Sequence, residues 1–277
     1  MLRLLALALV PLALVSGAAA GGGGPSPGLM TGWDGTLDAT RGVRYVVMPV
    51  ARSTIVAAVR TSDGRMLRYS TIKGGFGVPI VAYDGTTEGV SRDGRTLVLA
   101  GFGAGDRTRF VVLSTARLQL RKTVTLPGLW SFDALSRDAR TLFAVQYHGS
   151  GPNAPYSVRA VSLVTGKPVG GAIVAKGEED EAAMNGSPWS RARSANGAWA
   201  YTFYAKPNGT AFVHALNTSN RRAVCIDLPW QSSTETLSLV RLSLADAGRS
   251  LVLARPGGNR LAVVDTTSFN VRSLATP

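Results

Sequence analysis

The sequence is poor in the residues from which common catalytic sites are built, with one cysteine and two histidines in 277 residues. A single thiol, Cys225, excludes an internal disulfide, and two distant histidines give no pair with metal-ligand spacing. The chain also lacks a Gly-x-Ser-x-Gly elbow, a His-Glu-x-x-His motif, a P-loop and a dinucleotide fingerprint. No familiar catalytic motif is present, although a Ser/His/Asp arrangement assembled from remote positions stays open.

Acidic residues are also scarce, because 17 Asp and Glu stand against 30 Lys and Arg, which gives a formal net charge of +13. Such an excess suggests an anionic neighbour, such as a cell-wall polymer, an acidic polysaccharide, lipid headgroups or nucleic acid. The arginines are scattered through turns and strand edges without a dense basic run, which argues against nucleic acid. We therefore expect generic surface charge or an anionic surface partner.

Only one long apolar run is present, and it lies at the N-terminus. Residues 1–20 combine a basic residue, an apolar stretch and a small-residue end, which is typical of a secretory signal peptide. The stretch is shorter than the roughly 20 apolar residues of a membrane span, although an uncleaved anchor is the alternative. We expect a secreted, extracellular protein of bacterial type, with a Gly/Pro-rich spacer and lead-in at 21–41, one domain at 42–277 and no membrane span in the mature chain.

A turn of the form Ser-x-Asp-Gly-Arg-Thr-Leu recurs along this domain. It appears at 91–97 and at 136–142, where Ala replaces Gly, and in weaker copies that begin at Ser194 and Ala245. Asp and Gly tolerate the positive φ that tight turns need, and each copy is followed by short apolar strands. Repeats of about 40 to 50 residues with four strands each are typical of β-propeller blades.

The repeat predicts an all-β propeller, which we interpret as five four-stranded blades at 43–81, 89–126, 131–175, 191–228 and 237–274. Poor helical periodicity and an abundance of glycine and proline agree with this class. In the first blade, strands are expected near 43–50, 54–60, 66–72 and 78–82. Six blades, or an open array that pairs with a partner chain, are the alternatives.

Two segments carry a family resemblance. The segment 263–274, VVDTTSFNVRSL, and the segment 128–147, GLWSFDALSRDARTLFAVQY, resemble two parts of the YVTN-type propeller repeat, with WD-like and TolB-like repeats as related alternatives. The resemblance extends over about 42–277. It implies blade geometry and provides no catalytic residue.

In propellers, the loops that lead into the first strand of each blade and the loops between second and third strands share one face. Trp130, Trp189 and Trp230 each lie near the start of a first strand and are candidates for an aromatic binding platform, or for packing between blades. His148, in a Gly/Pro-rich loop, is a further candidate for binding, or an ordinary exposed histidine.

An insertion before the fourth blade contains four successive acids at 178–181. Of these, Glu178 and Asp180 are candidate ligands of a hard cation such as Ca²⁺, although the spacing is not that of an EF-hand. A solvated loop, or pairing with the nearby Arg191 and Arg193, is the alternative.

The leading hypothesis is therefore a secreted, non-catalytic propeller without a cofactor that binds a protein or an anionic envelope polymer. The alternative is a propeller-type lactonase or hydrolase with a metal in the central channel, for which Glu178, Asp180 and His148 would have to converge on the axis. A structural module completed only by a partner chain is a third reading.

Overall fold

The computed structural model describes residues 29, 30, 32–102, 107–149, 154–175 and 184–277. This part of the chain is dominated by antiparallel strands, with one short helix and one 3₁₀ turn among its elements. The all-β prediction is therefore confirmed. No helix in the described ranges has the length and apolar character that crossing a membrane requires.

Apart from the two-stranded pair β1–β6, the strands form five sheets in chain order, which we call blades 1 to 5. Blade 1 contains β2 (Gly32–Asp38), β3 (Val43–Val50), β4 (Ser53–Arg60) and β5 (Met66–Lys73). Blade 2 contains β7 (Thr96–Phe102), β8 (Arg107–Ser114) and β9 (Gln119–Pro127), and the bridge between Val90 and Leu97 marks its innermost strand.

The other three blades have four complete strands each. Blade 3 contains β10 (Trp130–Leu135), β11 (Thr141–Tyr147), β12 (Tyr156–Ser162) and β13 (Pro168–Ile173). Blade 4 contains β14 (Ser187–Arg193), β15 (Trp199–Ala205), β16 (Thr210–Asn217) and β17 (Arg222–Gln231). Blade 5 contains β18 (Arg241–Ala245), β19 (Ser250–Ala254), β20 (Arg260–Asp265) and β21 (Val271–Ser273).

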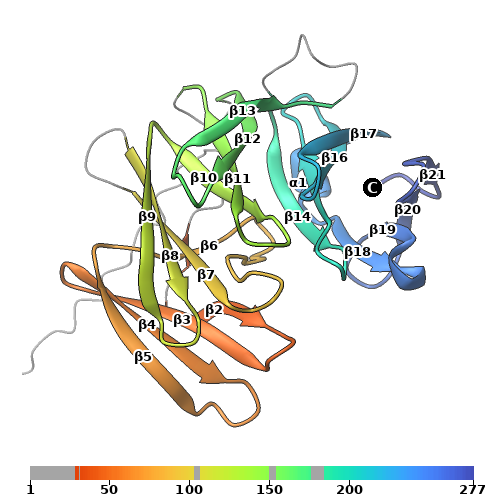
Figure 1. Cartoon of the computed structure of the whole chain (residues 1–277). Helices are drawn as coiled ribbons and strands as arrows, with labels where there is room; N and C mark the ends of the chain where they lie inside the picture. Colours follow the sequence, from red (N-terminus) through yellow and green to blue (C-terminus); the bar gives the residue numbers. More distant parts are fainter. Residues whose placement is uncertain (1–28, 31, 103–106, 150–153, 176–183) are drawn as a thin grey trace, which may run out of the picture.

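The blades are arranged radially around a central axis (Figure 1), and within each one every strand pairs antiparallel with the next. Helix α1 (Thr234–Ser238) joins blades 4 and 5, and the 3₁₀ turn η1 (Asp246–Gly248) joins β18 to β19. The predicted five blades therefore match the observed sheets in number and order.

Side-chain alternation along the strands makes both faces of an inner blade apolar. On β7, Leu97 and Leu99 join a cluster with blade 1, whereas Val98 and Ala100 join a cluster with blade 3. Successive side chains of a strand point to opposite faces, so each central strand contributes to two cores. Separate apolar clusters fill the spaces between blades 1 and 2, 2 and 3, 3 and 4, and 4 and 5.

The recurring Ser-x-Asp turn joins the first and second strands of the blades. In blade 3, Ser136 Oγ donates to Asp138 Oδ1 (2.6 Å) and accepts from the Thr141 N–H (3.0 Å). Blade 2 repeats both bonds through Ser91 and Asp93 at 2.6 and 3.0 Å. The motif is therefore structural, because its side chains satisfy backbone groups that the tight turn leaves unpaired.

The structure differs from the sequence interpretation in blade 1. Its innermost strand is β2, from the predicted lead-in, whereas β6 (Val78–Pro79), expected in the fourth strand of that blade, pairs with β1 (Leu29–Met30). Segment 32–38, GWDGTLD, has two glycines and no apolar alternation, so it does not resemble a strand. Gly35 is required there, because a Cβ would lie 2.2 Å from the Tyr45 carbonyl oxygen.

We predict that Ala139→Gly raises the free energy of unfolding by about 0.5–1 kcal/mol. Ala139 has φ 54°, whereas the equivalent turn residues of blades 2 and 4, Gly94 and Gly197, are glycines at 62° and 72°. A left-handed conformation costs a non-glycine residue roughly 1–2 kcal/mol, and only part of this is offset by the larger unfolded-state entropy of glycine. Urea unfolding measures the change. Ala139→Val should destabilise, and a destabilising Ala139→Gly would contradict this explanation.

Candidate functional site

The central axis is occupied by a buried arginine. Arg191 of β14 donates from Nε to Glu88 Oε1 at 3.0 Å and from Nη1 to Asp133 Oδ1 at 2.7 Å. It also donates from Nη1 to Thr202 Oγ1 at 2.6 Å and from Nη2 to the Asp133 carbonyl at 2.7 Å. The three charged side chains are at most 5 % exposed. One guanidinium therefore joins blade 4 to β10 of blade 3 and to the segment before blade 2.

Burial and ion pairing shift the pKa of Arg191 in opposite directions. Burial by itself would lower the pKa of Arg191, but the carboxylates of Glu88 and Asp133 raise that pKa above its usual value. Arg193 adds a second cation at the rim, with Nη1 3.1 Å from Glu88 Oε2. The axial carboxylates are thus paired with arginine, and Asp133 Oδ2 is buried without a hydrogen-bond partner among the described residues.

His214 of β16 is buried beside this network. Burial lowers the pKa of His214 to about 4, and the Asp133 carboxylate opposes that shift only in part. Its Nε2 is buried without a hydrogen-bond partner in the described part of the protein. His214 is therefore a neutral structural residue at physiological pH.

The structure separates the aromatic residues proposed as a platform. Trp130 is buried between blades 2 and 3 and donates from Nε1 to the Pro127 carbonyl at 2.7 Å, and Trp230 is buried between blades 4 and 5. Trp189 is partly buried against the same cluster as Trp230 and contacts Tyr83 in a tilted arrangement, with 5.0 Å between ring centroids. These contacts favour packing between blades over a shared platform.

Of the remaining predicted residues, the structure describes His148 alone. His148 is exposed, and its Nε2 lies 2.8 Å from Ser157 Oγ. Glu178 and Asp180 lie outside the described residues, so the Ca²⁺ site stays a prediction. Among the described residues, no group of three or more His, Cys, Asp or Glu side chains is arranged to hold a metal ion. The alternative pairing of Arg191 and Arg193 with acids is realised through Glu88 and Asp133 instead.

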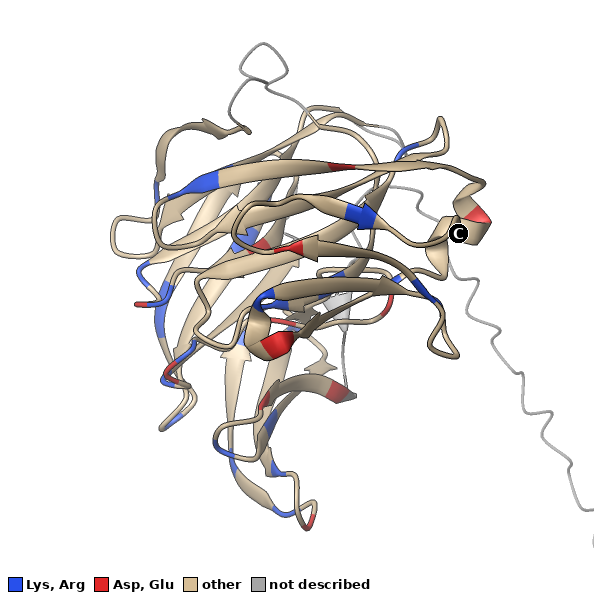
Figure 2. Ribbon diagram, turned by 90° about the vertical axis from the view of Figure 1, so that its right-hand side faces the viewer, with Lys and Arg blue, Asp and Glu red and all other residues tan. Residues whose placement is uncertain are grey.

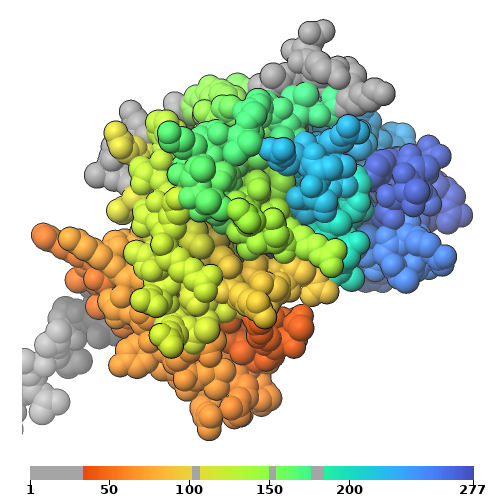
Figure 3. All heavy atoms as spheres, viewed as in Figure 1, coloured from red at the N-terminus to blue at the C-terminus, as the bar shows by residue number. Residues whose placement is uncertain are grey.

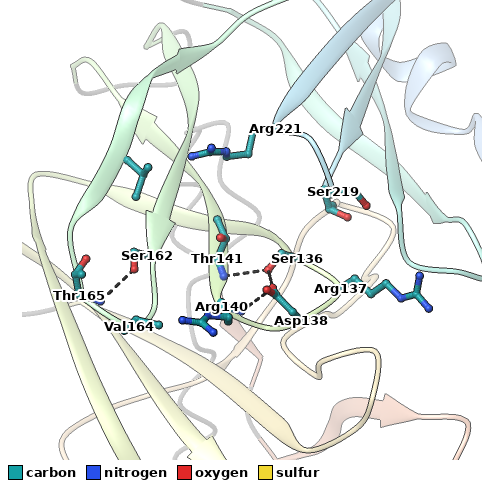
Figure 4. A pocket seen from close by; sticks show the side chains of 12 residues that line it. Ser136, Arg137, Asp138, Arg140, Thr141, Ser162, Val164, Thr165, Ser219 and Arg221 are labelled. Atoms are coloured by element: carbon teal, nitrogen blue, oxygen red, sulfur yellow. Dashed lines mark hydrogen bonds between the residues drawn. The ribbon is translucent and has the colours of Figure 1, made fainter.

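A groove of about 850 Å³ lies on the face formed by the turns between first and second strands and between third and fourth strands. Blade 3 contributes the β10–β11 turn and the β12–β13 turn, and blade 4 contributes the β16–β17 turn. Figure 4 shows its lining, of which the polar members are Ser136, Arg137, Asp138, Arg140, Thr141, Ser162, Thr165, Thr218, Ser219 and Arg221. The groove is therefore rich in hydroxyl groups and guanidinium groups.

The charge of this groove is positive, because its lining contains three arginines, Arg137, Arg140 and Arg221, and one acid, Asp138. Hydrogen bonds from Ser136 and from the Arg140 N–H lower the pKa of Asp138 and fix its carboxylate in the turn. None of the three arginines has an ion pair within the described residues. In Figure 4, Arg140 and Arg221 extend toward the side of Thr165, whereas Arg137 points to the opposite side.

Sequence reasoning noted the arginines of the groove only as part of the repeated turn. Arg137 and Arg140 belong to the motif at 136–142, whereas Arg221 lies 81 residues beyond Arg140 (221 − 140) and adjoins them only after blades 3 and 4 pack. Elsewhere the basic residues are dispersed, and on the side shown in Figure 2 they are spread over several strands and turns. The groove therefore brings together in one hollow three arginines that come from two blades.

Comparison with known proteins identifies the fold. The β-propeller domain of Cps50 (Swd1) from Myceliophteria thermophila aligns over 90 % of this chain and 71 % of its own, with a TM-score of 0.50 and 12 % identity. The fold is a β-propeller. Dihydro-heme d1 dehydrogenase NirN, in complex with DHE, aligns over 85 % of this chain with a TM-score of 0.51 and 12 % identity, and this chain covers 44 % of it.

Neither a protein-family model nor a curated protein sequence matches the chain. At 12 % identity the two structural matches establish the propeller fold alone. Function therefore has to be argued from the propeller's own sites.

We predict that Arg191→Met lowers the free energy of unfolding by about 3–5 kcal/mol, because it leaves the buried Asp133 carboxylate without a cation and Glu88 with only its ion pair to Arg193. Urea unfolding at pH 7 measures the loss. Arg193→Met is the matched control, since that side chain is 25 % exposed and makes one ion pair; its cost should be about 1 kcal/mol or less. Equal losses in the two variants would contradict a central role for Arg191.

We predict that His214 makes the propeller less stable in acid. Because its folded pKa is lowered to about 4 from 6.5, the unfolded chain binds the proton first. The stability is fully present above pH 6.5 and falls by about 3 kcal/mol as the pH drops to 4. The difference between wild type and His214→Gln in urea unfolding at several pH values isolates this effect. Replacing the exposed His148 by Gln should leave the dependence of stability on pH unchanged. If the stability of His214→Gln depended on pH in the same way as that of the wild type, His214 would not be the cause of the acid sensitivity.

Proposed function

We propose that this propeller is a secreted, non-catalytic binding module that recognises an anionic polymer of the cell envelope through the groove between blades 3 and 4. The observation that carries the proposal is the set of three arginines around one hydroxyl-lined groove, none of which has an ion pair with another described residue. The signal-like segment 1–20 supports an extracellular location.

The lining of the groove suits a polyanion better than a small apolar ligand. Guanidinium groups bind carboxylate, sulfate or phosphate oxygens through paired N–H donors, and the Thr and Ser hydroxyls supply further hydrogen bonds. Arg137 points away from Arg140 and Arg221 in Figure 4, so the cations are presented on two sides of the cavity. A polymer with repeated negative charges can reach both sides at once.

The overall charge supports the same ligand class. A formal net charge of +13 produces a positive potential around the propeller, which accelerates the approach of polyanions and weakens as salt increases. This field has no sequence or shape specificity of its own. The groove supplies the specificity, because it holds cations and hydroxyls in one fixed arrangement.

The alternative of a metal-dependent lactonase or hydrolase has less support in the described residues. The axial carboxylates of Glu88 and Asp133 are paired with Arg191, and His148 is exposed with a contact to Ser157. The groove therefore suits ligand binding, and the ion pairs at the axis suit stability of the fold.

We predict that the triple variant Arg137→Gln, Arg140→Gln, Arg221→Gln weakens binding to a polyanion at least tenfold. One charge-assisted hydrogen bond contributes about 1.5–3 kcal/mol, and about 1.4 kcal/mol corresponds to a factor of ten. Binding of inorganic polyphosphate and of polygalacturonate, with neutral dextran as the reference, is measured by calorimetry at several salt concentrations. The phosphate and carboxylate polymers distinguish two classes of anion.

The matched control is Arg52→Gln, Arg65→Gln, Arg117→Gln, which removes the same charge from exposed positions outside the groove. It should weaken binding by no more than about threefold, through the long-range field alone. Equal losses in the two triple variants would show that binding follows net charge, and the groove would then not be the site.

A further inference from the structure

The five blades leave one space between neighbours without a core. Four separate clusters fill the spaces from blade 1 to blade 5, but among the described residues no apolar cluster and no hydrogen bond joins blade 5 to blade 1. In Figure 3, blade 1 (orange) and blade 5 (blue) lie at separate ends of the arc, with an open bay between them. The outward faces of these two blades are therefore not packed against another blade in the described part of the chain.

The outward face of blade 1 is apolar. The register of β2 to β5 places one set of side chains on this face: Leu37, Arg44, Val46, Met48, Val50, Ser53, Ile55, Ala57, Val59, Met66, Tyr69, Thr71 and Lys73. At its centre, Val46, Ala57 and Val59 form a small buried cluster that no other blade joins. The composition is that of a face packed against a neighbour.

Large apolar side chains are exposed around this centre. Leu37, Val50 and Met66 are 46–48 % exposed, and Tyr69 is 67 % exposed. These four are among the eleven exposed large hydrophobic residues found in the whole described part of the chain. Exposed apolar residues gathered on one sheet face mark an interaction surface, whereas scattered ones do not.

The outward face of blade 5 has a different character. Its central row runs from Ser243 through Val252 and Val263 to Arg272, and Arg260 and Asp265 lie in the flanking rows. The two ends of this row and both flanking residues are exposed polar side chains. A polar outer face is what a terminal repeat needs in order to end an array in water. The outward face of blade 5 therefore suits contact with water, whereas that of blade 1 does not.

Charges on the face of blade 1 indicate the chemistry of its partner. Arg44 lies near one end of the face and Lys73 near the other, and none of the face residues is acidic. Along β3 the two ends, Arg44 and Val50, are six residues apart, or about 20 Å at the rise of a β-strand. A second copy of this basic chain would bring like charges together, which disfavours self-association.

We infer that the outward face of blade 1 is the docking surface for a partner protein with an apolar centre and acidic residues at its rim. Tyr69 and Met66 supply the apolar contact area, and Arg44 and Lys73 orient the partner by pairing with its acids. This surface is separate from the groove between blades 3 and 4. The proposal therefore does not depend on polyanion binding.

The test uses the full chain carrying a photo-crosslinking benzoylphenylalanine in place of Tyr69, produced in its own organism. Tyr69 is mostly exposed, so this aromatic replacement preserves the fold. The control carries the same group in place of Ser243, on the outward face of blade 5. Irradiation should yield one adduct through position 69 and none through position 243, and mass spectrometry should place the cross-link in a partner segment next to acidic residues.

The charge requirement is tested in the same experiment with Arg44→Glu and Lys73→Glu, which should reduce the adduct at least tenfold. Circular dichroism verifies that these variants fold. An adduct that survives charge reversal, an adduct with a second copy of the chain, or no adduct at position 69 would each overturn the proposal. Light scattering of the purified chain measures its oligomeric state independently. A dimer that Tyr69→Asp abolishes would show that the face binds a second copy of the chain and would overturn the proposal of an acidic partner.

Discussion

A single buried guanidinium holds the centre of this propeller together. Arg191 contacts two carboxylates and a threonine hydroxyl, and these groups come from blade 3, blade 4 and the segment before blade 2. A buried charge is tolerated only when it is paired and hydrogen-bonded. The geometry of the three blades around the axis is therefore constrained by one residue whose five N–H donors require fixed partners.

This arrangement also determines where ligands are to be sought. Where Arg191 neutralises the acids of the axis, the axis serves stability. The arginines that are available to a ligand lie instead on the face formed by the inter-strand turns, where Arg137, Arg140 and Arg221 line a groove between blades 3 and 4. The repeated turn of blade 3 supplies Arg137 and Arg140, and the packing of blade 3 against blade 4 adds Arg221 from the β16–β17 turn.

Some features of the fold could be predicted from the sequence, and others could not. The Ser-x-Asp turn at 136–142 and the alternation on β7 predicted strands, turns and blades correctly, because both depend on local backbone geometry. Segment 32–38 was assigned to the lead-in, because its glycines and aspartates are not typical of a strand. The segment is nevertheless a strand, which pairs with β3. Trp130 begins the first strand of blade 3 as predicted, but Trp230 lies on β17, the fourth strand of blade 4, and only packing showed that each is buried between blades.

The sequence by itself determined the all-β class, the number and order of the blades and the basic character of the chain. Period-two alternation, turn chemistry and composition are local or summed properties, and they do not depend on which segments meet. The tertiary structure alone decided that Arg191 finds Glu88 and Asp133, which lie 103 and 58 residues earlier. It also decided that blade 1 ends in an apolar face. Both features arise from contacts between distant segments, whose partners are chosen by the packing of whole blades rather than by any local pattern.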